Sequence, residues 1–365
     1  MSAAGVPIAR PQARAWRGVL AHTAVPMLFV VLCVFGIVVA AIPPEFLLRE
    51  LLSRFGRNAV LILSLLVPIL AGLGLNFGIV IGAMAGQAAA IMITYWKIEG
   101  IAGFALAWLI AAPLGALFGY LTGQLFNRAK GREMVTGLIA AFFANGIYQL
   151  VFLFAIGSVI PFDDPRMVLP QGFGLRNTVD VIGIQYAMDD LVPVKIWMGG
   201  SVVRIPVATI VLVGVFCVLN LWFLRTKLGQ ELRAMGQDPH VSQTAGIRVD
   251  RNRIIATMIS TILAAWGQLL FIQNLGTFNT YNSHEQVGMF SIAALLVSGA
   301  TVSRATIWHA LIGTVLFHTL FVVSPLAGKA LLGDAQIGEY FRVFVAYAVI
   351  TVALVLHAWQ KKKKG

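Results

Sequence analysis

The chain has 365 residues, of which 59% are hydrophobic and 12% charged, and 27 Lys and Arg against 15 Asp and Glu give a formal net charge of +12. Soluble domains are about 45–50% apolar and about 25% charged, so the composition excludes an ordinary soluble domain and also a disordered chain. Cys33 and Cys217 both lie in apolar runs, which excludes a disulfide framework. The composition therefore indicates a polytopic membrane protein.

Ten apolar runs are long enough to cross a bilayer, which takes about 20 helical residues. The predicted spans are 20–42, 58–73, 76–96, 101–126, 134–160, 205–224, 254–274, 287–303, 305–324 and 341–359. The first span is predicted to be an uncleaved anchor, because its apolar stretch exceeds the about 7–15 residues of a signal peptide. We predict an all-α polytopic membrane protein with about ten transmembrane helices, forming one transmembrane domain over residues 1–365.

Two connections exceed the length of a turn: 161–204 and 225–253. Five spans lie on each side of 161–204, so the two halves would begin on opposite faces, as in an inverted-topology repeat. When the N-terminus is placed in the cytoplasm, most Lys and Arg fall in cytoplasmic segments and most Asp and Glu fall outside. Because short cytoplasmic loops are enriched in basic residues, we predict that both termini and 225–253 are cytoplasmic and that 161–204 is extracytoplasmic.

Several kinds of chemistry are missing from the sequence. No Asp, Glu, Lys or Arg lies near the middle of a predicted span, which disfavours coupling to an ion gradient. The sequence has no phosphate-binding G-x-x-x-x-G-K-[ST] motif, no hydrolase or metalloprotease motif, and no Cys/His metal spacing. We therefore predict no catalytic residue, no metal and no cofactor, and we expect any ATP hydrolysis to take place on a separate chain.

The connection 225–253 carries the most informative pattern. Leu228, Leu232 and Met235 recur at helical spacing, which predicts a short amphipathic helix that Gly236 ends in the left-handed conformation. Asp238-Pro239 then predicts an N-cap followed by Pro at the first position of a second short helix, and Gly246 closes that helix. An ordinary solvated connector is the alternative, but it needs no pair of capped helices.

These residues resemble the cytoplasmic coupling loop of ABC importer permeases, in the branched-chain amino acid, monosaccharide and nucleoside permease family. The family pattern G-x-x-[IL]-R-A-x-G-x-[ND], followed by a small residue, Gly and Ile, is matched by the stretch from Gly229 to Ile247. A Gly-rich region at Ala71 to Gly86 and a polar-to-small run from Asn279 to Gly299 extend the likeness. The chain departs from sugar permeases at Asn76, where an acidic residue is common, so the solute class stays open.

The resemblance implies a permease subunit in the bacterial cytoplasmic (inner) membrane that carries a small polar solute, with sugar or nucleoside favoured. It implies as partners ABC ATPase subunits, a second permease subunit, an extracytoplasmic solute-binding protein and membrane lipid, with no nucleic acid. The residues expected to couple the chain to the ATPase are Gly229, Glu231, Arg233, Ala234, Gly236, Asp238 and Gly246.

The translocation path is expected to be lined by uncharged polar residues within the apolar spans, with aromatic walls. Helix–helix hydrogen bonding is the alternative role for each of them. The candidates are Asn76, Phe77, Gln87, Asn145, Gln149, Trp266, Gln268, Gln273, Asn274, Ser291 and Ser298.

Two further patterns concern packing and docking. The spacing of Gly115, Gly119 and Gly123 gives G-x-x-x-G twice, which favours close helix contact. The acidic pairs Asp163-Asp164 and Asp189-Asp190 in 161–204 could meet basic residues of a solute-binding protein, or could simply be solvated.

Two rival functions stay open at this point. One is an ion-coupled secondary transporter with inverted repeats. The other is a scaffold or channel subunit without an active cycle.

Overall fold

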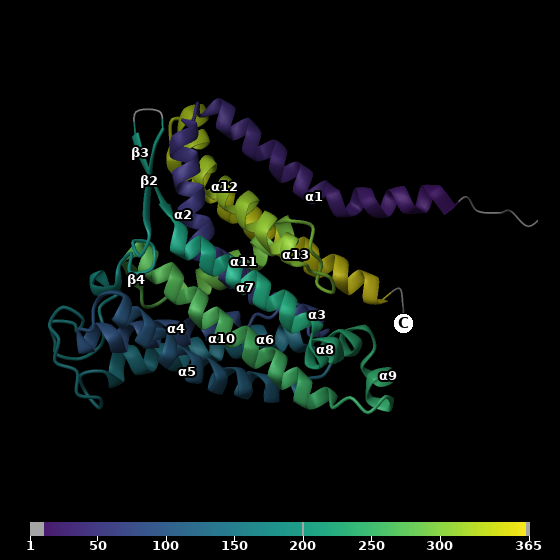
Figure 1. The fold of residues 1–365 in the computed structure, drawn as a ribbon, viewed down its shortest axis with the longest axis horizontal. Coiled ribbons are helices and arrows are strands. Elements are labelled where there is room, and N and C mark those ends of the chain that lie inside the picture. Colours follow the sequence, from purple (N-terminus) through teal and green to yellow (C-terminus); the bar gives the residue numbers. More distant parts are fainter. Residues whose placement is uncertain (1–10, 199–200, 363–365) are drawn as a thin grey trace, which may run out of the picture.

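The computed structural model describes residues 11–198 and 201–362, and most of them are helical (Figure 1). The α-helices are α1 (Pro11–Val39), α2 (Pro44–Leu63), α3 (Leu66–Leu70), α4 (Ile79–Trp96), α5 (Gly100–Arg128), α6 (Glu133–Leu150), α7 (Val207–Arg225), α8 (Lys227–Gln237), α9 (Pro239–Thr244), α10 (Val249–Leu275), α11 (Ser283–Val297), α12 (Ile307–Leu332) and α13 (Ala335–Lys362). A π-helical turn (Val151–Ala155) extends α6, and a 3-10 turn (Ile182–Ile184) lies in the long connection that follows.

Eight helical stretches among the described residues are long and apolar enough to cross a membrane, with α2 and α3 counted as one stretch, Pro44–Leu70. The apolar helix Val25–Val39 and the 15-residue α11 are shorter. Each of the ten predicted spans contains a helix, so the all-α polytopic class is confirmed. The inverted-topology relation between the two halves stays a prediction.

The predicted second span, 58–73, begins too late, because α2 starts well before it and carries charged side chains. Arg54 pairs with Glu50 one turn earlier at 3.4 Å, and Arg57 donates a hydrogen bond to Asn274 Oδ1 at 3.1 Å. The expectation that charge stays away from the middle of the spans is therefore wrong for α2. The apolar run alone could not find these residues, because the partners that allow their burial lie partly on another helix.

Two other predicted spans, 134–160 and 287–303, run too far at their C-terminal ends. The helical turns end at residues 155 and 297, and the chain then passes through Gly157 and Gly299, whose φ angles are +83° and +88°. A positive φ breaks a right-handed helix and suits glycine, so these glycines direct the chain into the next connection.

Helix α10 lies at the centre of the fold and packs against α2, α4 and α5 (Figure 1). The three glycines at G-x-x-x-G spacing on α5 face it, as the spacing predicted. A Cβ atom at Gly119 would lie 2.6 Å from Met258 Cα, and one at Gly123 would lie 2.9 Å from Ile254 Cα, so the two backbones touch where the side chains are missing. Two glycines of α4 approach α10 in the same way: Gly82 and Gly86.

The two ends of α10 point to two faces of the molecule. Strands β1 (Thr178–Asp180) and β4 (Thr277–Asn279) pair at its C-terminal end, and β2 (Pro193–Met198) and β3 (Ser201–Pro206) form an antiparallel hairpin on the same side; we call this the hairpin face (Figure 1). Helices α8 and α9 lie at the N-terminal end of α10, on what we call the α8 face. Helix α1 begins and α13 ends toward the α8 face, as an even number of crossings requires.

Candidate functional site

Helix α8 is amphipathic, as predicted, and it packs on the membrane helices by its apolar side. Leu232 and Met235 are buried, and they contact a small cluster that includes Leu73, Phe126 and Ala256 from three other segments. The Thr226 hydroxyl accepts a hydrogen bond from Gly229 N at 3.3 Å and caps the start of the helix. The helix is therefore fixed to the α8 face, and its opposite side is left free for another molecule.

Helix α9 begins and ends as the sequence predicts. The Asp238 carboxylate accepts hydrogen bonds from His240 N at 2.8 Å and Val241 N at 3.1 Å, and Pro239 occupies the first turn. Gly246, with a φ of +84°, follows the last turn. The two short helices are thus joined by a single capping residue.

Gly236 behaves differently from the prediction. It lies inside α8, which continues to Gln237, and the structure gives it no positive φ. A Cβ atom there would collide with the Leu70 carbonyl oxygen and would lie 3.0 Å from Gly72 N. Gly236 is therefore required by the close approach of α8 to the end of α3, and the prediction that it terminates the helix is wrong.

The remaining coupling candidates divide between exposed and bonded side chains. Arg233 and Ala234 are exposed, and the Arg233 guanidinium has no hydrogen bond or ion pair with any residue that the structure describes. Glu231 instead accepts a hydrogen bond from Asn252 Nδ2 of α10 at 2.8 Å. Glu231 therefore ties α8 to α10, whereas Arg233 is available to a partner.

A buried ion pair that the sequence does not predict lies near the N-terminal end of α10. Arg253 of α10 pairs with Glu133 at the start of α6, and it also donates to the Phe126 carbonyl oxygen at 3.1 Å and to Asn127 Oδ1 at 2.9 Å. The Arg253 and Glu133 side chains are only 9% and 11% exposed. The connection between α5 and α6 is thereby locked to the first turns of α10.

Several path candidates satisfy their polar groups within the protein. Asn76 donates to Ser260 Oγ at 3.0 Å and accepts from Gly78 N, and Trp266 donates to the Trp108 carbonyl oxygen. The hydroxyls of Ser291 and Ser298 bond to carbonyl oxygens of their own helix, and Phe77 is buried in the core. These contacts give each residue a structural role, and its place in the path stays a prediction.

His284, which is not among the predicted path residues, joins three other candidates. Its ring nitrogens lie 2.9 Å from Gln87 Oε1 and 2.9 Å from Asn145 Oδ1, and Asn145 also bonds to Gln149 at 3.3 Å and to Glu285. The network connects α4, α6 and α11. Residues 275–286 lie between two predicted spans, whereas α11 begins at Ser283, so the sequence does not reveal that His284 is helical.

Two buried glutamines of α10 keep free hydrogen-bonding capacity. Neither amide atom of Gln268 has a partner among the described residues, and Gln273 uses Oε1 to accept from Met188 N but leaves Nε2 unpaired. Gln87 Nε2 is likewise buried and unpaired. Unpaired buried amides are costly, so these atoms are the natural contacts for water or a polar solute inside the helix bundle.

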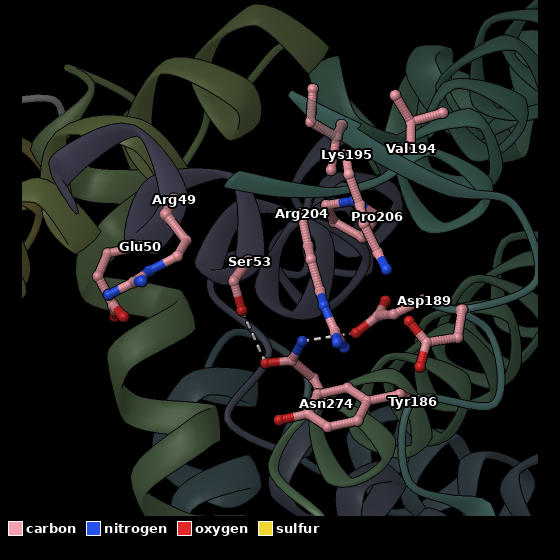
Figure 2. Close-up of a pocket in the computed structure, with 12 residues that line it drawn as sticks. Arg49, Glu50, Ser53, Tyr186, Asp189, Val194, Lys195, Arg204, Pro206 and Asn274 are labelled. Atoms are coloured by element: carbon pink, nitrogen blue, oxygen red, sulfur yellow. Dashed lines mark hydrogen bonds between the residues drawn. The ribbon is translucent and has the colours of Figure 1, made fainter. Parts of the chain in front are cut away.

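Asn274 lies at the end of α10 and forms the floor of a cavity of about 240 Å³ on the hairpin face (Figure 2). Its Oδ1 accepts from Ser53 Oγ at 3.0 Å and from Arg57, and its Nδ2 donates to Asp189 Oδ2 at 2.6 Å. Asp189 also accepts a hydrogen bond from the Thr209 hydroxyl. Every polar atom of the Asn274 side chain is thus used to hold three elements together.

In each of the two acidic pairs of 161–204, one aspartate is buried and the other is exposed. Asp164 is buried and accepts hydrogen bonds from the Arg166 guanidinium, the larger of the effects that lower its pKa from the ordinary 3.8. Asp189 is buried in the Asn274 cluster. Of these four aspartates, only Asp163 and Asp190 are exposed, so half of the predicted docking charge is used within the chain.

The fold defines a multi-pass, all-α membrane protein with a pair of short helices on its α8 face. Residues 47–354 match the family model of the branched-chain amino acid transport system permease component, and the chain belongs to this family. The resemblance seen at 229–247 is thereby confirmed over most of the chain.

The relatives are named as permease proteins, two of them of import systems. The autoinducer 2 import system permease protein LsrC of Photorhabdus laumondii subsp. laumondii is 24% identical over 331 residues, which cover 90% of this chain and 87% of LsrC. The ribose import permease protein RbsC of Escherichia coli K12 is 23% identical over 336 residues, covering 90% and 91%. The probable ABC transporter permease protein YphD of E. coli K12 is 28% identical over 184 residues, 47% of this chain and 52% of YphD. No solved structure matches the chain significantly.

Proposed function

We propose that this permease component carries a small polar solute, with a sugar or nucleoside favoured, across a bacterial inner membrane as part of an ABC importer. In this proposal the α8 face is cytoplasmic and binds separate ATPase subunits, and the hairpin face receives solute from an extracytoplasmic solute-binding protein. A second permease subunit, identical or homologous, completes the assembly.

The helix pair α8–α9 carries this proposal. One side of α8 is buried on α3, α5 and α10, while Arg233 and Ala234 on the other side are exposed. A helix held in this way transmits a push from a bound partner to the membrane helices, because Glu231 bonds it to α10 and Gly236 packs against the end of α3. Arg253 in turn joins α10 to the connection between α5 and α6. The likeness to import permeases supports an ATPase as that partner.

For the path we propose the His284 network together with Gln268. These groups lie on α4, α6, α10 and α11, and several of their buried polar atoms are unpaired. A neutral solute with hydroxyl groups could satisfy such atoms in turn as the helices move. Gln149 and Asn145 would act as one unit because they are bonded to each other.

The test is reconstitution of the chain with its ATPase and binding protein in proteoliposomes, followed by uptake of radiolabelled D-ribose and uridine. Arg233→Glu is expected to abolish ATP-driven uptake while thermal stability stays within about 0.5 kcal/mol of the wild type, because the side chain is exposed and unpaired. Arg132→Glu is the matched control, since Arg132 is an exposed cation on the same face outside α8 and α9. Equal uptake by Arg233→Glu and wild type would rule out the coupling role.

The ion-coupled carrier keeps one observation in its favour, the charged residues Arg54 and Arg57 on α2. It predicts uptake that follows an imposed proton or sodium gradient without ATPase subunits. Uptake that depends on ATP and ignores both gradients would exclude it.

A further inference from the structure

The cavity on the hairpin face is built from four separate parts of the chain. Helix α2 supplies Arg49 and Ser53, the segment after the 3-10 turn supplies Tyr186 and Asp190, the hairpin supplies Lys195 and Arg204, and Asn274 forms the floor (Figure 2). The floor is fixed by the hydrogen bonds to Ser53 and Asp189. The walls therefore stand on a rigid base and enclose a space that the protein does not fill.

Most of the charged side chains that line the cavity form no ion pair with a described residue. Arg49, Lys195 and Arg204 make no ion pair with any residue in the described ranges, and Asp190 makes none either. Figure 2 shows the Arg204 side chain directed toward Asn274 and Asp189. Cations and carboxylates thus line the same cavity with few ion pairs among the described residues, which leaves most of their hydrogen-bonding groups available to a ligand.

The strand register supplies a second, independent observation. Lys195 and Arg204 are directly opposite each other in the antiparallel hairpin, so both side chains project from the same side of it. Like charges in such positions destabilise a hairpin. The arrangement is relieved when a hydrogen-bond acceptor lies between the two cations, and the cavity is where such an acceptor would sit.

The chemistry of the walls selects the kind of molecule. The cations are donors only, the carboxylates of Asp189 and Asp190 are acceptors only, and a hydroxyl group can both accept and donate. Three cations and three carboxylates line the space, the third carboxylate being that of Glu50, which also pairs with Arg54. A volume of about 240 Å³ lies below the about 300–1,000 Å³ of sites for drug-sized ligands and suits one small solute.

We propose that this cavity is a receiving site of the permease for one uncharged, polyhydroxylated solute such as a monosaccharide. The hydroxyls bond to Lys195, Arg204 and Asp190, and the Tyr186 ring contributes an apolar surface. The choice of solute rests on the proposed function, whereas the position of the site rests on the cavity itself. The site holds solute between its release at the hairpin face and its entry between the helices.

The experiment measures sugar binding to the permease–ATPase complex in nanodiscs, without binding protein, using tritiated D-ribose, D-xylose and D-galactose at millimolar concentrations. We expect at least one of these sugars to bind, and we expect Arg204→Ala and Asp190→Asn each to weaken that binding at least tenfold. Lys97→Gln is the matched control, because Lys97 is an exposed cation on the same face that does not line the cavity. ATP-driven uptake by the same variants should show a raised KM with an unchanged kcat.

Three results would overturn the receiving site. The first is that none of the three sugars binds; the second is that binding is equal in wild type, Arg204→Ala and Asp190→Asn. The third is that Arg204→Ala weakens association with the binding protein and leaves sugar binding intact, which would make the cavity a docking surface. Each can occur while the wild type retains ATP-driven uptake, so failure of the site is distinguishable from failure of the proposed function, which shows as loss of uptake in the wild type.

Discussion

The charged residues that join helices on the α8 face are paired, whereas the cations that line the cavity on the hairpin face form no ion pair with a described residue. On the α8 face, Arg253 and Glu133 form a buried ion pair and Lys130 pairs with Asp250 at 2.6 Å, so neighbouring helices are joined. On the hairpin face, Lys195 and Arg204 line a cavity without an ion pair among the described residues. Paired charges hold neighbouring helices together, whereas unpaired charges are available to a ligand.

The largest effect that tests this contrast is expected at the buried pair. Arg253→Ala should lower the free energy of unfolding by about 3–5 kcal/mol, because it leaves Glu133 buried and unpaired. The matched control, Lys130→Ala, breaks an ion pair whose side chains are 56% and 61% exposed and should cost at most about 1 kcal/mol. Chemical denaturation in detergent measures both. Equal losses of unfolding free energy in the two variants would show that burial of the pair does not matter, and would contradict its role in holding the helices of the α8 face together.

A smaller effect is expected at the contact between α8 and α3. Gly236→Ala places a Cβ atom against the Leu70 carbonyl oxygen, so α8 must shift at a cost of about 1–3 kcal/mol. We expect ATPase activity to persist while it loses its coupling to uptake. Gly214→Ala on α7, where nothing lies within 4 Å, is the control and should be neutral or slightly stabilising. Coupled uptake by Gly236→Ala would show that this contact is not needed.

On the hairpin face, the corresponding test is Asn274→Ala. The change leaves Asp189 and Arg57 without a shared hydrogen-bond partner and should cost about 1–3 kcal/mol in the free energy of unfolding. Asn177→Ala, which removes an exposed hydrogen bond to Asn279 on the same face, should cost less. Thermal unfolding compares them. A loss at Asn274 no greater than that at Asn177 would contradict the rigid floor of the cavity.

The smallest effect concerns the pH dependence of stability. Hydrogen bonding to Arg166 lowers the pKa of Asp164 below 3.8 in the folded protein. The ionised carboxylate therefore stabilises the fold above pH 3.8, and this contribution is lost as the pH falls toward the lowered pKa. Asp164→Asn should reduce the unfolding midpoint at pH 7, and the difference from wild type should shrink as the pH is lowered to 3. A difference that does not change with pH would contradict the assignment.

The sequence predicts those parts of the molecule whose determinants are local. The apolar runs locate the helices, and Asp238-Pro239 and Gly246 locate the ends of α9, because capping involves residues a few positions apart. The sequence does not reveal Arg57, whose burial depends on Asn274 far along the chain, or His284, whose partners lie on α4 and α6. Gly236 was assigned the wrong geometry for the same reason, since the atom that requires glycine there is the Leu70 carbonyl oxygen.

The glycine contacts between α5 and α10 have a mechanical consequence. Where Gly119 and Gly123 meet Met258 and Ile254, the backbone of α5 lies directly against α10, because the glycines place no α5 side chain at these contacts. Rolling α10 about its own axis would drive its side chains into α5, so we expect the two helices to move as one rigid unit. Any bending that opens or closes the molecule must then be concentrated in the connections at the ends of α5 and α10. The distance between a spin label on α5 and one on α10 should therefore stay constant throughout the transport cycle.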